Sequence, residues 1–313
     1  MRVLKGVLML PETVQEIAAH LREIEQQDTV WVEANFVERI DALDMLSWRI
    51  LERIENVQYV HGYRPELAGL YHRATQLWQR LEAVNAQLFG RLRGQLVAAT
   101  SPGPLLRQMC ETYVGNVTHE LTWQDLDADY LDVFVNGILQ IDHLPAETQD
   151  LQPGMIGYHP TPARVIFALI EHTRLSAREV FYDLGAGLGR VALLVGLLTA
   201  AQVRGVEFEP AYCAFAQQRA DLLRLSHVTF LNVDARQADY ADGTLFFLYT
   251  PFTGRMLQEV LAKLAAVART HPITLATYGA CTRDVARQHW VQPTVQQAFA
   301  HDTLTLFTST TST

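Results

Sequence analysis

Hydrophobic side chains in the first half of the chain recur at the spacing of one face of a helix. They fall every three or four residues over residues 11–56 and again over residues 67–98. This period gathers the apolar side chains on one side, so both stretches are predicted to form amphipathic helices. Residues 61–65 and 101–104, which contain glycine and proline, are predicted to interrupt them. A further helix is predicted over residues 123–139.

After residue 150 the pattern changes to short β-rich runs that alternate with helical stretches. The predicted strands cover residues 180–184, 203–206, 228–233, 245–249 and 273–278, and helical patterns lie between them at 191–199, 211–225 and 255–270. Such alternation is typical of a parallel sheet with helices on both faces. Two last runs, 295–299 and 303–308, predict a terminal hairpin with an antiparallel strand. We therefore predict an all-α domain over residues 1–150, for substrate access or interaction, and an α/β domain over residues 151–313.

The charge of the chain limits its partners. The formal net charge is −9, and residues 1–150 hold 12 Lys/Arg against 22 Asp/Glu. An acidic balance argues against a protein that coats nucleic acid, so no nucleic-acid partner is expected. No window approaches about 18 uninterrupted apolar residues, and the short apolar run near Met1 lacks the features of a signal peptide or anchor, so no membrane association is expected.

The cysteines and histidines form no ligand-spaced set. Cys110, Cys213 and Cys281 lie far apart, which predicts neither a disulfide scaffold nor a zinc site and favours a reducing, cytoplasmic location. The histidines near the start of the α/β domain, His119, His143 and His159, show no spacing typical of a helical metal-binding pair. No metal site is therefore expected.

A glycine-rich turn follows the first predicted strand. Its three alternating glycines are Gly185, Gly187 and Gly189, and a helix comes next. Such a turn lets a ligand meet bare backbone at a helix N-terminus. Arg190 stands where the dinucleotide fingerprint needs its last glycine, which disfavours NAD and FAD. Asp183 precedes the turn, and Glu207 closes the next strand, where its carboxylate can accept both hydroxyls of a ribose.

These motifs resemble, in order, those of the class I S-adenosylmethionine (SAM) dependent methyltransferases, over about residues 155–313. The resemblance implies a Rossmann-like sheet of seven strands that ends in an antiparallel hairpin, with SAM as the cofactor. It implies that the glycine loop cradles the methionyl and ribose portion and that Glu207 holds the ribose diol. Asp234 would contact the adenine amino group, and Phe208 and Ala235, which follow the two acidic residues, are further candidate cofactor contacts.

A finer resemblance lies in the segment from Tyr158 to Pro162. It is similar to the segment that closes over the methionine end of SAM in nucleosomal lysine methyltransferases of the telomeric-silencing-disruptor (Dot) type and their bacterial relatives. Tyr158 and Thr161 are therefore candidate cofactor contacts. Thr161 is also the predicted N-cap, and Pro162 the first residue, of a helix over residues 163–172. Basic tails like those of the eukaryotic enzymes are not found here, so their chromatin substrate is not implied.

The turn after the fourth predicted strand faces the transferred methyl group in this family. It reads Tyr249, Thr250, Pro251 and Phe252. Relatives that methylate adenine or glutamine amides carry Asn or Asp followed by two prolines and an aromatic residue, so this turn disfavours both acceptors. Tyr249 and Thr250 are the candidate catalytic residues, able to orient a nucleophile, and Pro251 and Phe252 are candidates for the substrate side. A plain strand end and turn is the alternative interpretation.

Acidic residues are dense just before the α/β domain. On a helix Asp125, Asp129 and Asp132 would share one face, which favours a cationic acceptor such as an amine or a basic peptide. The alternative is a solvated helix face. The run that begins at Asp125 also resembles the start of a calcium loop, but it lacks the glycine and the closing glutamate.

We therefore predict a SAM-dependent methyltransferase that moves a methyl group to an N or O atom of a protein side chain or small molecule. Two alternatives stay open. One is a non-catalytic SAM-binding partner protein whose helical half is an interaction module, and the other is a SAM enzyme with chemistry other than methylation. The sequence is also compatible with a homo-oligomer.

Overall fold

The computed structural model describes residues 2–115, 130–295 and 302–310, which fall into two compact units. The first unit comprises Met1–Leu92 and Met109–Gly115, and the second comprises Arg93–Gln108 and Asn116–Thr313. Periodicity alone places a boundary near residue 150, whereas the contacts group helix α6 (Tyr130–Leu139) with the sheet. Arg93 shows why, because its guanidinium donates to the carbonyls of Gly137 and Ile138 at the end of this helix.

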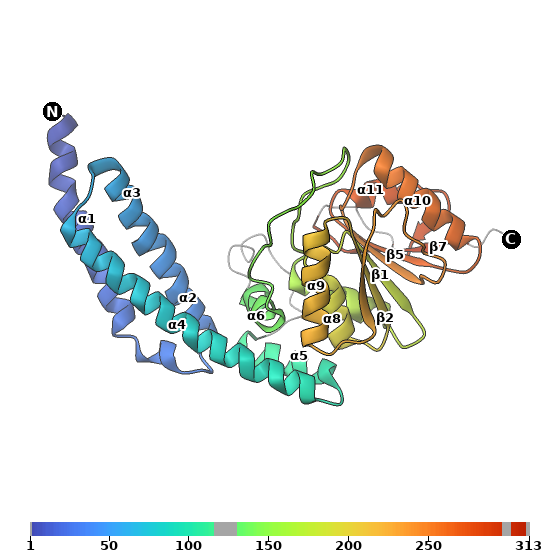
Figure 1. The fold of residues 1–313 in the computed structure, drawn as a ribbon, viewed down its shortest axis with the longest axis horizontal. Coiled ribbons are helices and arrows are strands. Elements are labelled where there is room, and N and C mark those ends of the chain that lie inside the picture. Colours follow the sequence, from blue (N-terminus) through green and yellow to red (C-terminus); the bar gives the residue numbers. More distant parts are fainter. Residues whose placement is uncertain (1, 116–129, 296–301, 311–313) are drawn as a thin grey trace. The chain divides into compact units, whose positions relative to one another are not determined.

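The first unit is built from long helices, as predicted (Figure 1). Its elements are α1 (Arg2–Glu25), the 3-10 turn η1 (Asp28–Trp31), α2 (Phe36–Asp44), the π-helical stretch η2 (Met45–Leu51), α3 (Glu52–His61), and most of α4 (Pro65–Ala98), with the end of α5 (Pro102–Tyr113). The predicted interruption is confirmed: α3 ends at His61, Gly62 follows with a φ of 74°, and α4 begins at Pro65. Among the described residues, none of the helices has the length and apolar character needed to cross a membrane.

A buried arginine ties the first unit together. Arg39 is fully buried on α2, and its Nε donates to Asn85 Oδ1 on α4 at 2.6 Å. Its Nη atoms donate to the backbone carbonyl of Val30, within η1, and to those of Val32 and Glu33, which follow η1, at 3.0 to 3.2 Å. The guanidinium therefore ties the backbone around η1 to helix α4.

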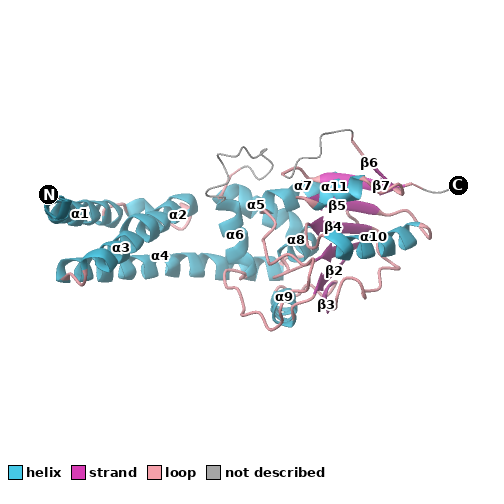
Figure 2. Cartoon of the chain, turned by 90° about the horizontal axis from the view of Figure 1, so that it is seen from above, coloured by secondary structure: helices cyan, strands magenta, loops and turns pink. Residues whose placement is uncertain are grey.

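The second unit contains a seven-stranded sheet with helices on both faces (Figure 2). Its strands are β1 (Val180–Leu184), β2 (Gln202–Glu207), β3 (Val228–Asn232), β4 (Leu245–Tyr249), β5 (Thr274–Tyr278), β6 (Val291–Pro293) and β7 (Thr305–Ser309). The order is β3-β2-β1-β4-β5-β7-β6, with β1 to β5 parallel and β7 antiparallel to both β5 and β6. This is the expected methyltransferase fold, terminal antiparallel hairpin included. The first hairpin strand lies earlier than predicted, at β6, and part of the predicted run 295–299 lies outside the described residues.

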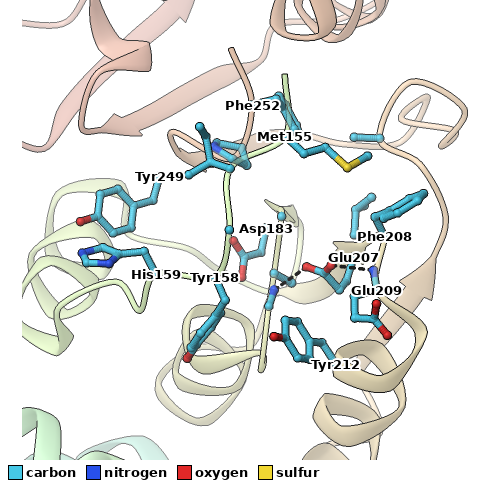
Figure 3. A pocket seen from close by; sticks show the side chains of 18 of the residues that line it. Met155, Tyr158, His159, Asp183, Glu207, Phe208, Glu209, Tyr212, Tyr249 and Phe252 are labelled. Carbon is cyan, nitrogen blue, oxygen red and sulfur yellow. Dashed lines mark hydrogen bonds between the residues drawn. The ribbon is translucent and has the colours of Figure 1, made fainter. Parts of the chain in front are cut away.

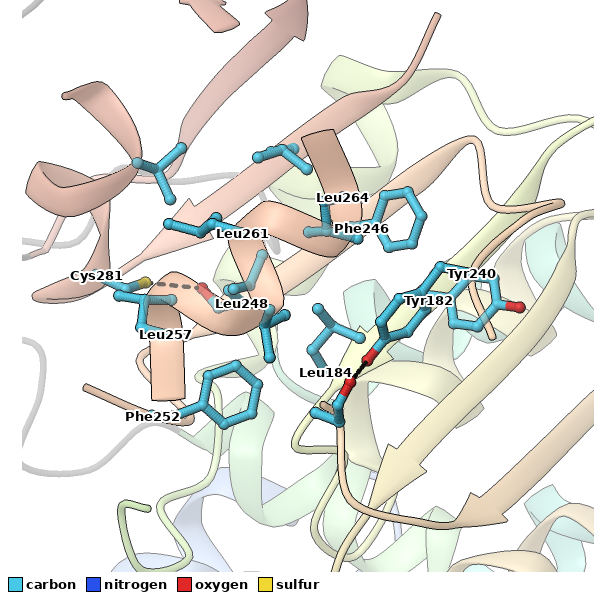
Figure 4. Close-up of a cluster of buried hydrophobic side chains, with 14 of the residues drawn as sticks. Tyr182, Leu184, Tyr240, Phe246, Leu248, Phe252, Leu257, Leu261, Leu264 and Cys281 are labelled. Atoms are coloured by element: carbon cyan, nitrogen blue, oxygen red, sulfur yellow. Dashed lines mark hydrogen bonds between the residues drawn. The ribbon is translucent and has the colours of Figure 1, made fainter. Parts of the chain in front are cut away.

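Alternation along the central strands sorts their side chains onto two faces. Tyr182, Leu184, Phe246 and Leu248 point to the face covered by α10 (Gly254–Ala268) and α11 (Cys281–Ala286), where they form the main core with apolar residues of those helices (Figure 4). Helices α8 (Arg190–Leu198) and α9 (Pro210–Leu222) contact β1, β2 and β3. The sheet is thus buried on both sides, which explains the nearly continuous apolar runs of its strands.

Between α6 and α7 (Ala163–Thr173) the chain crosses the carboxyl edge of the sheet as an irregular segment, residues 140–162, which we call the strap. Glu209 accepts hydrogen bonds from Thr148 Oγ1 and the backbone N–H of Gln149, at 2.6 and 3.0 Å. Met155 forms a β-bridge with Phe252 after β4. The strap is therefore fastened over the ends of β2 and β4. Helix α7 begins at Ala163, the start of the predicted range, but Pro162 rather than Thr161 takes its N-cap position.

Candidate active site

A cavity lies at the carboxyl ends of β1, β2 and β4, beneath the strap (Figure 3). It encloses about 1070 Å³ counting its open mouth. Open α/β sheets bind their ligands at this edge, where neighbouring loops diverge. Residues of the glycine loop, the ends of β2 and β4, and the strap line it, among them Met155, Tyr158, His159, Thr161, Asp183, Gly185, Gly187, Arg190, Glu207, Phe208, Glu209, Tyr212, Ala235, Tyr249, Thr250, Pro251 and Phe252.

The glycine loop brings bare backbone to the cavity. Gly185 and Gly187 have φ values of 79° and 54°, in the region that side chains disfavour. A Cβ added to Gly185 would lie 2.5 Å from the Pro251 side chain, and one added to Gly187 would lie 2.5 Å from the Tyr158 ring. Any side chain at these two positions would therefore displace a wall of the cavity. These two glycines are explained by this close approach as well as by the turn.

Glu207 connects the glycine loop to the end of β2. Its Oε2 accepts the backbone N–H of Gly187 at 2.7 Å, and its Oε1 accepts that of Glu209 at 2.8 Å. Burial raises the pKa of this carboxyl group, while the backbone donors oppose that rise. The carboxylate is thus held rigidly at the edge of the cavity, between Gly187 and Phe208.

Asp183 lies at the floor of the cavity, at the end of β1. Burial, and then the nearby charge of Glu207, raises the pKa of its carboxyl group to about 7. Its Oδ2 has no hydrogen-bond partner among the described residues. A buried carboxylate oxygen without a donor is costly unless a ligand supplies one, and a cationic group suits it best.

A buried arginine links the loop to the strap. Arg190, 5% exposed at the start of α8, donates to the carbonyl of Thr161 at 2.9 Å and to Asn136 Oδ1 on α6 at 2.6 Å. It also pairs with Asp132 at 2.9 Å, and the same Asp132 oxygen accepts the N–H of Ala163 at 2.7 Å, which caps α7. From the sequence, Arg190 was significant only because it stands where the dinucleotide fingerprint needs a glycine. Its Nε–H has no partner among the described residues, so one donor is left at the cavity.

Two of the predicted acidic contacts have partners inside the protein. Asp132 is engaged by Arg190 and by the N-terminus of α7, and it does not line the cavity. Asp234 receives two side-chain nitrogens and the backbone N–H of Arg236, whose hydrogen bonds lower the pKa of that carboxyl group. Its neighbour Ala235 lines the cavity, whereas Asp234 does not. Asp125 and Asp129 lie outside the described residues.

The polar groups of the turn after β4 form hydrogen bonds within the protein. Thr250 has a φ of 44°, which is rare for a β-branched residue. Its hydroxyl donates to the carbonyl of Tyr278 at 3.3 Å and accepts the N–H of Cys281 at 3.2 Å. The carbonyl of Pro251 accepts the N–H of Ile156 on the strap at 3.1 Å. The structure thus brings Tyr249, Thr250 and Pro251 to the cavity as predicted, but with the Thr250 hydroxyl already bonded.

Strap residues complete the walls. The rings of Tyr158 and Tyr212 meet edge to face at 5.8 Å, and Tyr212 donates to Glu147 Oε1 at 2.9 Å. His159 lies beside Tyr249, with ring centroids 5.6 Å apart. Met155, His159 and Tyr212 were not among the predicted site residues. Only the position of His159 beside Tyr158 offered a sequence signal, since the other two are placed by long-range packing.

The residues of the cavity fit SAM. The glycine loop has room only for backbone, so it can cradle a ligand closely. The unpartnered Asp183 oxygen suits a ligand with an ammonium group, and the cavity walls carry four carboxyl groups, those of Glu147, Asp183, Glu207 and Glu209, against one arginine. This charge balance favours a positively charged cofactor.

Comparisons with known proteins find one matching family model and several similar solved structures. Residues 157–247 match the family model described as histone methylation protein DOT1. No curated protein matches the chain. Among solved structures, an RNA methyltransferase from Salinibacter ruber with S-adenosyl-L-homocysteine is 21% identical, with a TM-score of 0.38, covering 48% of this chain and 92% of that one.

Two further solved structures are similar over about half of the chain. Precorrin-6y C5,15-methyltransferase from Geobacter metallireducens is 19% identical, with a TM-score of 0.37 and 49% and 90% of the two chains covered. TrmN from Thermus thermophilus is 16% identical, with a TM-score of 0.39 and 47% and 48% covered. The strand order and the motifs that line the cavity thus give the second unit the class I SAM-dependent methyltransferase fold, and its residues 157–247 are similar to the DOT1 family.

Proposed function

We propose that the protein transfers a methyl group from SAM to an N or O atom of a protein side chain or small molecule. The observation that carries this proposal is one continuous cavity. It joins the glycine loop, Asp183 and Glu207 to the turn after β4. A cofactor held by the glycine loop, Asp183 and Glu207 would direct its reactive end toward the turn after β4.

The proposed cofactor contacts follow the walls of the cavity. Glu207 accepts the ribose hydroxyls, and Phe208 and Ala235 flank the adenine. Asp183 faces the methionine ammonium group, because its Oδ2 has no other donor among the described residues. The free Nε–H of Arg190 is suited to the methionine carboxylate. Tyr158 and Thr161 close this end from the strap.

SAM supplies an activated methyl group, so the protein's task is alignment and exclusion of water. Tyr249 ends β4 at the cavity, half-buried, and burial raises the pKa of its phenol. It therefore remains a hydrogen-bond donor at neutral pH and can orient an acceptor atom. Phe252 is 3% exposed and packs into the main core, so it supports the wall from behind.

The acceptor is proposed to be neither adenine nor a primary amide. Those planar groups need free oxygens after β4 to accept both hydrogens. Here the Thr250 hydroxyl already bonds Tyr278 and Cys281, and the Pro251 carbonyl already accepts from Ile156, which disfavours both acceptors. The acidic lining favours an acceptor with a positive charge. A cytoplasmic location is part of the proposal, and the three described cysteines are buried and form no disulfide with one another.

Calorimetry with SAM tests the core of the proposal. We expect Glu207→Ala to weaken SAM binding by roughly ten- to a hundredfold, because charge-assisted hydrogen bonds to the ribose are lost. Asp221→Asn is the matched control: its carboxylate accepts from Gln217 on the exposed side of α9, and affinity should stay unchanged. Undetectable SAM binding by the wild type, or equal affinity in Glu207→Ala, would contradict the proposal. Turnover of SAM with amine and peptide acceptors then tests the transfer itself.

A further inference from the structure

The strap sends two neighbouring side chains to different parts of the cavity (Figure 3). The Tyr158 ring lies over the glycine loop, where it blocks the space of a Gly187 Cβ. The His159 ring lies instead against Tyr249, at a centroid distance of 5.6 Å and an angle of 58°. His159 is thus placed at the end of β4, where the methyl group is expected, and away from the cofactor floor formed by Asp183 and Glu207.

Other polar groups around the cavity are less suited to take a proton from the acceptor. Glu209 accepts bonds from Thr148 and Gln149, and Glu147 accepts from Tyr212. Asp183 and Glu207 belong to the cofactor side. By contrast, His159 is exposed, and neither of its ring nitrogens has a hydrogen-bond partner in the described part of the chain. It is also the only histidine among the described residues that line the cavity.

We propose that His159 is a catalytic residue that accepts the proton of the methyl acceptor. This inference rests on the proposed function. The lone pair of the acceptor N or O forms a bond to the methyl carbon, the carbon–sulfur bond breaks, and its electron pair stays on sulfur as a neutral thioether. The acceptor's proton passes to a ring nitrogen of His159, and the imidazolium then releases it to solvent. Tyr249 holds the imidazole in place.

Several titratable groups surround this imidazole. Tyr249 contacts it from β4. Tyr278 on β5 lies beside Tyr249, with ring centroids 5.0 Å apart, and burial, then the charges of Tyr249 and Asp302, raises the pKa of Tyr278. Tyr158 precedes it on the strap, and Asp183 lies on the floor at the end of β1. A test must therefore separate His159 from Asp183, whose protonation also affects the binding of any SAM analogue.

Two cofactor analogues make that separation without a known acceptor. Sinefungin carries a protonated amine where SAM carries the transferred methyl, and S-adenosylhomocysteine carries nothing there. Both have the same amino acid end, so the effect of Asp183 on that end cancels in the ratio of their affinities. We expect this ratio to fall roughly tenfold from about pH 8 to about pH 5.5 in the wild type, because a neutral imidazole accepts from the amine and an imidazolium repels it.

Variants assign the effect to the residue. His159→Phe keeps a ring against Tyr249 but has no nitrogen, and His159→Gln keeps a neutral polar group. Both should make the ratio independent of pH, while His172→Gln, which changes a histidine in the last turn of α7, should leave the slope intact. A flat ratio in the wild type, or an unchanged slope in both His159 variants, would overturn the inference. If neither analogue binds the wild type, the proposed function itself fails.

Discussion

Asp183 is a carboxyl group that the fold buries at a cost. Burial and the neighbouring Glu207 raise its pKa to about 7, and one oxygen has no partner among the described residues. In the unfolded chain the same group ionises near the ordinary range of aspartate. The folded protein therefore holds this proton more tightly than the unfolded one. The contribution to stability is full at low pH and is lost as the pH rises through 7.

Removing this charge should stabilise the ligand-free protein at high pH. We expect Asp183→Asn to raise the free energy of unfolding at pH 8 by up to a few kcal/mol, with the gain shrinking toward pH 4, because the neutral amide avoids the cost of ionisation. Urea titrations of both proteins across this range measure the difference. The same variant should bind SAM more weakly at pH 8. A stability difference that does not depend on pH would show that Asp183 is not the titrating group.

At the scale of elements, the glycine loop and the strap are one structure. Gly187 and Tyr158 lie in contact although they are far apart in the sequence, and hydrogen bonds to Glu209 fasten the strap nearby. In the sequence, a glycine motif predicts only that the chain makes a turn. Here the second reason for glycine, a ring 2.5 Å from where a Cβ would lie, comes from the strap.

The contact predicts that two substitutions will be coupled. Gly187→Ala should weaken SAM binding by about tenfold or more, through a backbone penalty of about 1–2 kcal/mol and the displacement of Tyr158. Gly254→Ala is the control for the backbone penalty, because its φ of 56° is similar but no atom lies within 4 Å of an added Cβ. In a double-mutant cycle with Tyr158→Ala, measured by calorimetry, the steric part should disappear. Strictly additive losses would contradict the contact.

At the scale of the whole molecule, the chain divides its tasks between two units. Every described residue that lines the cavity belongs to the second unit. The first unit has its own core, in which Arg39 bridges α2, the turn after η1 and α4. Stability of the first unit and cofactor binding by the second therefore depend on separate residues.

Arg39→Met tests this separation. It removes the side-chain donor of Asn85 and of three backbone carbonyls, of which that of Val32 keeps the N–H of Asn35, so we expect the first unit to lose about 3 kcal/mol. Hydrogen exchange at the amides of α2 and α4 would report the loss, while SAM affinity stays unchanged. Arg53→Met, which removes an exposed ion pair with Glu16, should cost under about 1 kcal/mol. Equal loss of protection in the sheet would show that the two units unfold together.

The sequence by itself determined the helices, the five parallel strands, the glycine loop and the placement of Glu207 beside it. Each of these features follows from residues close together in the sequence, either from the periodic spacing of apolar residues or from a turn directly after a strand. Tertiary structure decided the rest. Asp132 and Arg190 are 58 residues apart, and Thr250 and Tyr278 are 28 apart. Their hydrogen bonds decide which polar groups are paired within the protein. His159 meets Tyr249 only because the strap crosses the sheet edge. Contacts between distant segments leave no periodic trace, so only the folded chain shows them.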